Sequence, residues 1–123
     1  MFNEKFMEVI KDEGVVAIVT TGESEAHVSN TWNSYLTLAD DNLLMIPAAG
    51  MIKTEKNILN NSKVKLTIGS KNVMGYRGMG TGFLIEGTAS FLKSGEKYEM
   101  MKAKFPFLTR VLVVEVNSIK QTL

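Results

Sequence analysis

The residues best suited to chemistry lie in one short run, Asn-Thr-Trp-Asn-Ser at positions 30–34, with a tyrosine at position 35. A half-buried strand normally keeps one face apolar. This run instead places four small hydrogen-bonding side chains around the only tryptophan of the chain. A planar, polar ligand would use both the donors and the ring. The candidate contacts are Asn30, Thr31, Trp32, Asn33, Ser34 and Tyr35.

A second candidate is the pair Lys53 and Thr54, which lies where a loop of small residues enters a predicted helix. Free backbone amides, the positive end of the helix dipole, a hydroxyl and an ammonium group could converge there on one phosphate. In the alternative interpretation, which this fragment alone favours, Thr54 only caps the helix and Lys53 is a solvated charge. The glycine and lysine spacing of a P-loop is absent, which argues against a nucleoside triphosphatase.

The glycine-rich stretch at 74–82 is a third candidate. It partly matches dinucleotide-binding fingerprints, but it leads into strand-like residues at 83–85 rather than into a helix. The helix dipole that those fingerprints use is therefore missing. We predict a loop whose glycines permit positive φ angles, with some contact to a ligand still open.

Composition excludes several other kinds of site. The 123 residues contain no cysteine, which excludes disulfides, thiolate nucleophiles and cysteine-ligated zinc or iron–sulfur clusters. His27 is the only histidine, so a histidine-based metal cluster is excluded, and we expect a structural or surface role for it. The isolated carboxylates Glu13 and Glu86 are expected to be solvated.

Charge and hydropathy limit the partners and the location. With 14 basic and 13 acidic residues the net charge is +1, which suggests no phosphate-coating surface for DNA or RNA. Residues 1–14 carry charges throughout and lack the apolar run of a signal peptide, and no segment reaches the length of a membrane span. We expect a cytoplasmic protein that binds neither nucleic acid nor membrane.

The hydrophobic pattern predicts one domain over residues 1–123. Helices are expected before Gly14, within 48–61 with Ile52, Ile58 and Leu59 on one face and the asparagines at its end, and at 95–104. Six strands are expected at 15–21, 26–38, 43–46, 63–69, 82–92 and 111–116. The first two strands would form a hairpin through a turn at 22–25, and Pro47 would close the third. Hairpin connections favour an antiparallel barrel over a doubly wound sheet.

Several of these segments together resemble a known family. The run at 30–36, the helix entry at 50–55, the stretch at 80–85 and the final residues 121–123 resemble the small FMN-binding proteins of anaerobic bacteria. These belong to the FMN-binding split-barrel group related to pyridoxamine-phosphate oxidase. The similarity extends over nearly the whole chain, and the run at 30–35 is its most specific part.

The resemblance implies a mainly β fold, a six-stranded antiparallel split barrel of Greek-key type with a few short helices. It also implies a homodimer with one noncovalently bound FMN per subunit near the interface. Lys53 and Thr54 would lie at the phosphate, and Trp32 and Tyr35 near the isoalloxazine ring. The remaining implied contacts are Gly50 and Met51 in the loop beside the site, the rest of the run at 30–34, and Leu123 from the neighbouring subunit.

One position departs from the family pattern. Where the family has a second tryptophan near the flavin, the alignment places Phe107, with Pro106 beside it. Aromatic stacking survives this change, but a readily oxidised ring is lost. Electron transfer from tryptophan to flavin at this position is therefore in doubt.

The leading hypothesis is an FMN-binding redox protein that carries electrons between unidentified partners, since no acid, base or nucleophile accompanies the site. Asn33, Ser34 and backbone groups are its candidate hydrogen-bond donors to the ring. The alternative is a flavin reductase or oxidase acting on NAD(P)H or a small substrate such as a pyridoxamine phosphate. An oxidase of that kind would need a further basic cluster, for which only Arg77 and Arg110 are obvious. A flavin-storage or sensing module is the third possibility.

Overall fold

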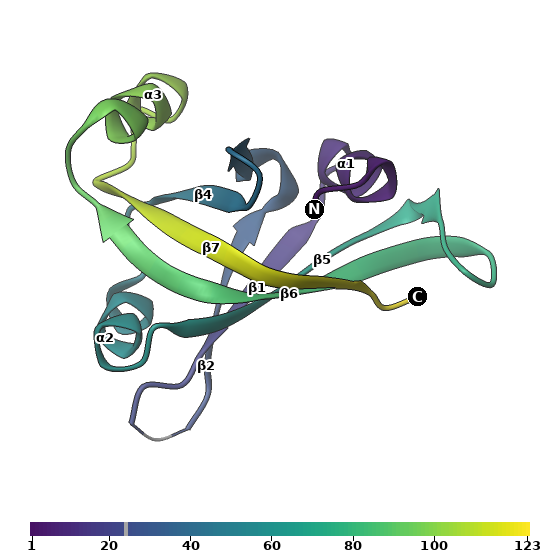
Figure 1. The fold of residues 1–123 in the computed structure, drawn as a ribbon, viewed down its shortest axis with the longest axis horizontal. Coiled ribbons are helices and arrows are strands. Elements are labelled where there is room, and N and C mark those ends of the chain that lie inside the picture. The colour runs from purple at the N-terminus through teal and green to yellow at the C-terminus, as the bar shows by residue number, and fades with distance from the viewer. Residues whose placement is uncertain (24) are drawn as a thin grey trace.

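A computed structural model describes residues 1–23 and 25–123 as one antiparallel sheet with three helices around it (Figure 1). The sheet order is β2-β1-β5-β6-β7-β4-β3. The strands are β1 (Val15–Thr20), β2 (His27–Trp32), β3 (Thr37–Ala39), β4 (Leu43–Ala48), β5 (Lys63–Met74), β6 (Met79–Leu92) and β7 (Arg110–Gln121). The helices are α1 (Glu4–Lys11), α2 (Ile52–Asn60), α3 (Glu96–Lys104) and a short 3-10 turn, η1 (Asn33–Tyr35). The mainly β, antiparallel class predicted from the sequence is confirmed.

The predicted number of six strands is wrong, because the run at 26–38 forms two strands rather than one. β2 ends at Trp32, η1 turns the chain, and β3 then pairs with β4. β2 is one edge of the sheet and β3 is the other, so η1 carries the chain from edge to edge. No pairing joins β2 to β3 among the described residues, so the seven-stranded sheet is not a closed barrel.

The predicted hairpin between the first two strands is confirmed. β1 and β2 pair antiparallel from Val15↔Trp32 to Thr20↔His27. One residue of the predicted turn, Ser24, lies outside the described residues.

The hairpin of β5 and β6 is longer than predicted. Its two strands pair from Lys63↔Thr88 to Met74↔Met79, so only residues 75–78 connect them. Residues 79–82 of the glycine-rich stretch that we expected to be a loop therefore belong to β6, and its first residue, Met74, ends β5. Gly75 is required by close packing, because a Cβ atom there would lie 2.7 Å from the backbone oxygen of Leu123.

Pro47 does not close its strand as predicted, because β4 continues to Ala48 and pairs with β7 along its whole length. On its other side β4 pairs with β3 only at residues 43–45. Pro47 thus lies beyond the part of that edge that β3 covers. A missing amide is tolerated at an uncovered edge, which explains why the strand survives a proline.

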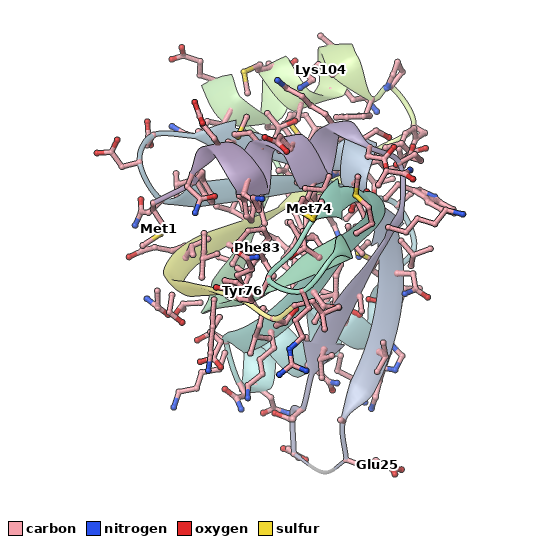
Figure 2. All side chains as sticks on the ribbon, turned by 90° about the vertical axis from the view of Figure 1, so that its right-hand side faces the viewer. Met1, Glu25, Met74, Tyr76, Phe83 and Lys104 are labelled. Atoms are coloured by element: carbon pink, nitrogen blue, oxygen red, sulfur yellow. The ribbon has the colours of Figure 1, made fainter. Side chains whose placement is uncertain are left out.

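α1 forms as predicted and closes one side of the core. The ring of its fully buried Phe6 lies 5.4 Å from that of Phe83, edge to face. Figure 2 shows Phe83 beneath the helix. The side chain of Asn3 caps the helix by accepting a hydrogen bond from the amide of Phe6 at 2.8 Å. The helix ends at Lys11, before Gly14 is reached.

α2 and α3 also form close to their predicted bounds, but the predicted buried face of α2 is wrong. Of its three expected core residues only Ile58 is buried, while Ile52 and Leu59 are each 80% exposed. Polar groups attach α2 to the sheet instead, since the buried amide of Asn57 donates to Thr20 Oγ1 at 3.1 Å. α3 covers a smaller apolar cluster that includes Met101.

Candidate functional site

The polar run at 30–35 is divided between exposed and buried environments. Side chains alternate along β2, so Asn30 and Trp32 are exposed whereas Thr31 is only 5% exposed. In η1, Asn33 is buried, Ser34 is exposed and Tyr35 is half-buried. Only part of the run can therefore touch a ligand directly through its side chains.

Asn33 uses its side chain to hold the fold together. Its Nδ2 group lies within hydrogen-bond distance of three carbonyl oxygens, those of Val9 at 3.2 Å, Asp12 at 2.8 Å and Gly69 at 3.2 Å. These join η1 to the end of α1 and to β5. Gly14 leaves the space, because a Cβ there would lie 3.0 Å from that nitrogen. The predicted donor to the ring is thus already engaged with backbone.

Ser34 makes a second internal contact, with the carboxylate of Glu13. Its hydroxyl donates to Glu13 Oε2 at 2.6 Å and its amide to Oε1 at 3.1 Å. These hydrogen bonds favour the ionised carboxylate and hold the pKa of Glu13 below its usual value. Glu13 is exposed as expected, but it is hydrogen-bonded as well as solvated. The hydroxyl of Ser34 is therefore committed to Glu13 in this structure.

Tyr35 lies in an aromatic group at the end of η1. Its ring is 5.2 Å from that of Phe105 and 5.6 Å from that of Phe107. Phe107 is 50% exposed and lies in the turn after α3, which Lys102 holds by donating to the carbonyls of Pro106 and Leu108. The position aligned with the family's second tryptophan is thus next to Tyr35.

The beginning of α2 presents backbone donors. Its first intrahelical hydrogen bond runs from the amide of Glu55 to the carbonyl of Met51 at 2.9 Å. The three amides before Glu55 therefore have no intrahelical acceptor, and no described side chain caps the helix. Met51 occupies the N-cap position in the left-handed region, with φ 57°. Lys53 is exposed beside these amides.

The alternative interpretation of Thr54 as the helix cap is wrong. Thr54 lies inside the first turn and is fully buried, and its hydroxyl shares a hydrogen bond of 2.9 Å with the hydroxyl of Ser29 on β2. Because Ser29 precedes Asn30, this bond brings the start of α2 to the start of the polar run. The structure thus joins two of the three segments predicted from the sequence.

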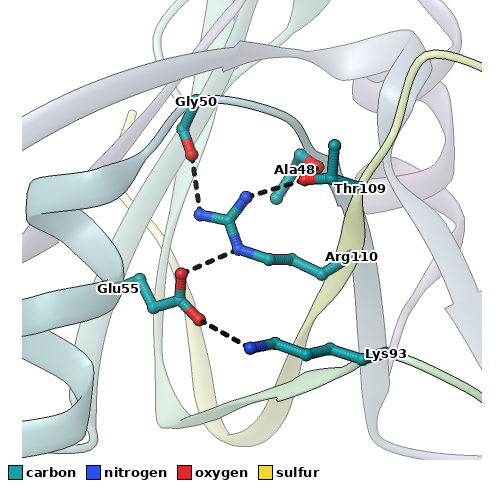
Figure 3. A network of polar contacts seen from close by, with 6 residues as sticks. All are labelled: Ala48, Gly50, Glu55, Lys93, Thr109 and Arg110. Carbon is teal, nitrogen blue, oxygen red and sulfur yellow. Dashed lines mark hydrogen bonds and ion pairs between the residues drawn. The ribbon is translucent and has the colours of Figure 1, made fainter.

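Arg110, which the sequence suggested only as a cation for a substrate phosphate, holds the loop before α2. Its Nη2 donates to the carbonyl of Gly50 at 2.7 Å, and its Nε lies 2.8 Å from Glu55 Oε1 (Figure 3). Arg110 is 8% exposed. Buried and paired in this way, it is not free to bind a substrate phosphate, and the exposed Arg77 lies elsewhere, in the connection between β5 and β6.

Leu123 lies apart from the other predicted contacts within one chain. Its backbone oxygen accepts hydrogen bonds from the amide of Tyr76 at 3.1 Å, from Thr81 Oγ1 at 2.9 Å and from Gln121 Nε2 at 3.0 Å. These contacts tie it to the hairpin of β5 and β6. Figure 1 shows α2 and this end of the chain at opposite ends of the molecule.

The described residues contain no group of three or more histidine, cysteine, aspartate or glutamate side chains that could hold a metal ion. Of the helices in residues 1–23 and 25–123, none combines the length and apolar character needed to cross a membrane.

A family model described as pyridoxamine 5'-phosphate oxidase matches residues 2–122. The chain belongs to this family. It is also 48% identical, over 96% of both chains, to an FMN-binding protein of Nitratidesulfovibrio vulgaris. The resemblance inferred from the sequence motifs is confirmed.

Solved structures agree with this family's fold. An FMN-binding protein from Syntrophomonas wolfei is 18% identical with a TM-score of 0.78, covering 98% of this chain and 85% of that one. HupZ from Group A Streptococcus is 17% identical with a TM-score of 0.79, covering 98% and 94% of the two chains. At such identities the similarity concerns the fold alone.

Sequence reasoning in this oxidase-family chain missed Ser29, and it considered Arg110 only as a cation for a substrate phosphate. Ser29 could have been found from the period of two, which puts it on the same face of β2 as Thr31. Arg110 opens β7 beside a run of buried aliphatic residues, a place where an arginine is rarely left unpaired. Its partners at positions 50 and 55 had no signal in the local sequence.

Proposed function

We propose that this chain is a redox protein that binds FMN noncovalently and carries electrons on it. The observation that carries this proposal is the 48% identity to an FMN-binding protein over 96% of both chains. When bound, FMN supplies one-electron and two-electron transfer. The role of the chain is then to bind, orient and partly cover the cofactor.

The donors at the start of α2 fit the phosphate group. A dianion there would meet three backbone amides without intrahelical acceptors, the positive end of the helix dipole and the ammonium group of Lys53. Ser29 and Thr54 lie beneath and fix the spacing between α2 and β2 through their shared hydrogen bond. This set of donors, without a metal or a P-loop, suits one terminal phosphate.

The exposed part of the polar run suits the rest of the flavin. Asn30 and Trp32 share the outer face of β2, and Trp32 is 46% exposed. Tyr35 and Phe107 continue the aromatic surface beyond η1. We assign Asn33 and Ser34 to positioning this surface, and leave direct hydrogen bonds to the ring to backbone groups and Asn30.

We further propose that the protein acts as a homodimer with the flavin near the interface. Leu123 is 64% exposed at the end of the molecule opposite α2, so it can approach the flavin only in a second copy. Val15, which pairs with Trp32 from β1, and Val28, on β2 itself, are 54% and 57% exposed, which leaves apolar surface for a partner. Light scattering should give twice the mass of the chain. A monomer that retains tight FMN binding would contradict the dimer.

A reductase or oxidase of the same family is the competing function. The engagement of Arg110 with Gly50 and Glu55 removes one of the two cations considered for a substrate phosphate. That engagement favours electron transfer over a pyridoxamine-phosphate reaction.

One sample can test these functions. The purified protein should show flavin absorbance in the visible range, and under anaerobic conditions a reduced low-potential carrier protein should bleach it. Rapid bleaching by NADH or NADPH would instead identify a reductase. Protein that is colourless and takes up no FMN on reconstitution would refute the proposal.

A further inference from the structure

Arg110 makes more polar contacts than a surface arginine would. Its Nη2 donates to the carbonyl of Gly50 at 2.7 Å and its Nη1 to Thr109 Oγ1 at 3.0 Å. Its Nε lies 2.8 Å from Glu55 Oε1, an ion pair in which the N–H does not point along the line to the oxygen. The guanidinium carbon lies 5.3 Å from the ring centre of Phe91. The side chain is therefore fixed on several sides.

These contacts hold the chain that leads into α2. Thr109 binds the carbonyl of Ala48 through its amide at 2.9 Å and its hydroxyl at 3.2 Å, while Arg110 holds Gly50 (Figure 3). Met51 follows in the left-handed region, which is unfavourable for a residue other than glycine. Such a conformation persists only where its surroundings impose it. The start of β7 supplies that restraint.

Arg110 also neutralises a carboxylate next to the donors of α2. Glu55 lies in the first turn of the helix, where its charge would oppose a bound phosphate. Arg110 lies at 2.8 Å from this carboxylate, whereas the exposed Lys93 lies at 3.9 Å. The nearer and more buried cation therefore provides most of the neutralisation.

We propose that Arg110 is a positioning residue for the flavin phosphate, an inference that rests on the proposed function. It touches no part of the flavin itself. It fixes the carbonyl of Gly50 and the carboxylate of Glu55 together, so that the amides of residues 52–54 stay turned towards the anion. A lysine keeps the charge but lacks the planar fork that holds both groups.

The test compares FMN with riboflavin, which lacks the phosphate, by quenching of Trp32 fluorescence. Arg110→Lys should weaken FMN about tenfold while riboflavin binding changes less than about twofold. Lys93→Gln is the matched control, because it removes a cation from the same carboxylate without touching Gly50. It should change neither affinity more than about twofold.

A second measurement uses the apo-protein and inorganic phosphate. In wild type, phosphate should shift the amide resonances of residues 52–54, and Arg110→Lys should reduce these shifts. Should that variant not fold, Arg110→Gln in a Glu55→Gln background removes both charges, and its FMN preference should still fall. If either folded variant keeps the wild-type preference for FMN over riboflavin, the role of Arg110 is overturned while the proposed function stands. Wild type that binds no flavin would overturn the proposed function as well.

Discussion

The start of α2 and the polar run at 30–35 direct their hydrogen-bonding groups in opposite ways. At α2, three backbone amides have no intrahelical acceptor, and the side chain of Lys53 beside them is exposed. In the run, the side-chain Nδ2 of Asn33 is engaged with three backbone carbonyls, and the hydroxyl of Ser34 is engaged with the carboxylate of Glu13. Both segments were predicted to bind one cofactor through their polar groups. Only the first leaves most of those groups without a partner within its own element.

The difference follows from what each kind of group can find within the protein. The first amides of a helix have no acceptor in their own helix, so they remain available to an anion. A buried asparagine side chain must instead pair with whatever backbone surrounds it, since an unpaired buried amide is costly. A polar run of this kind therefore indicates either a ligand or internal structural contacts, and the hydrogen-bond partners of each side chain decide between them.

Replacing Asn33 should have the largest effect. Asn33→Ala removes the donor to three carbonyls, so the free energy of unfolding of the apo-protein should fall by roughly 2–4 kcal/mol. Denaturation with urea gives this quantity. The matched variant is Asn30→Ala, whose exposed amide makes one hydrogen bond of 3.3 Å to Val16. Asn30→Ala should change the free energy of unfolding by less than about 0.5 kcal/mol. Equal losses of stability in the two variants would remove the contrast between the two asparagines.

Replacing Lys53 should have the next largest effect, on binding rather than on folding. Lys53→Ala removes an exposed cation beside the free amides, so FMN affinity should fall about tenfold, with riboflavin affinity nearly unchanged. Isothermal titration of the apo-protein with each flavin measures both. The control is Lys56→Ala, which removes an exposed lysine further along the same helix. It should leave both affinities at their wild-type values. Parallel loss of FMN and riboflavin on Lys53→Ala would refute a phosphate role.

The elements that local sequence predicts are those with a strong hydrophobic period. α1 and the sheet class were found from this signal, because the apolar period of α1 matches its buried residues. α2 and α3 were located as well, although the predicted buried face of α2 was wrong. The break at Asn33 was missed, since its cause is contact with residues 21 to 36 positions away. The strand-forming residues of the segment 26–38 cannot reveal such distant partners.

The same limit applies to the site. Lys53 and Thr54 were found because a helix start is a local feature, and the family motifs located Trp32. Local sequence gives no sign of the left-handed conformation of Met51. It also gives none of the hydrogen bond from Arg110 to the carbonyl of Gly50, 60 positions away. Candidate ligand contacts could thus be predicted from local sequence, whereas the residues that hold these segments in place needed the structure.

A smaller effect is expected at acid pH, where Asp12 holds the end of α1 to β5. The hydroxyl of Ser70 and the amide of Asn72 donate to its carboxylate and hold its pKa below the usual 3.8. Because this pKa is lower in the folded state, the carboxylate stabilises the fold at any pH above its pKa in the unfolded state. That contribution to stability is lost as the pH falls through its pKa in the folded state. Thermal unfolding between about pH 5 and pH 3 should therefore show a shallower loss of stability in Asp12→Asn than in wild type. Identical slopes would exclude this carboxylate as a contributor.

The smallest effect concerns Glu13, which joins the polar run to α1 from the exposed side. The hydroxyl of Ser34 is the main cause of its lowered pKa, followed by the amide of Ser34. Ser34→Ala removes the first and keeps the second, so the pKa of Glu13 should rise towards its usual value without reaching it. Titration of the carboxylate followed by NMR measures this shift, with Ser70→Ala as a control that acts on Asp12 instead. If the pKa of Glu13 does not move, the hydroxyl of Ser34 is not committed to it and becomes available to a ligand, which would make the two segments alike.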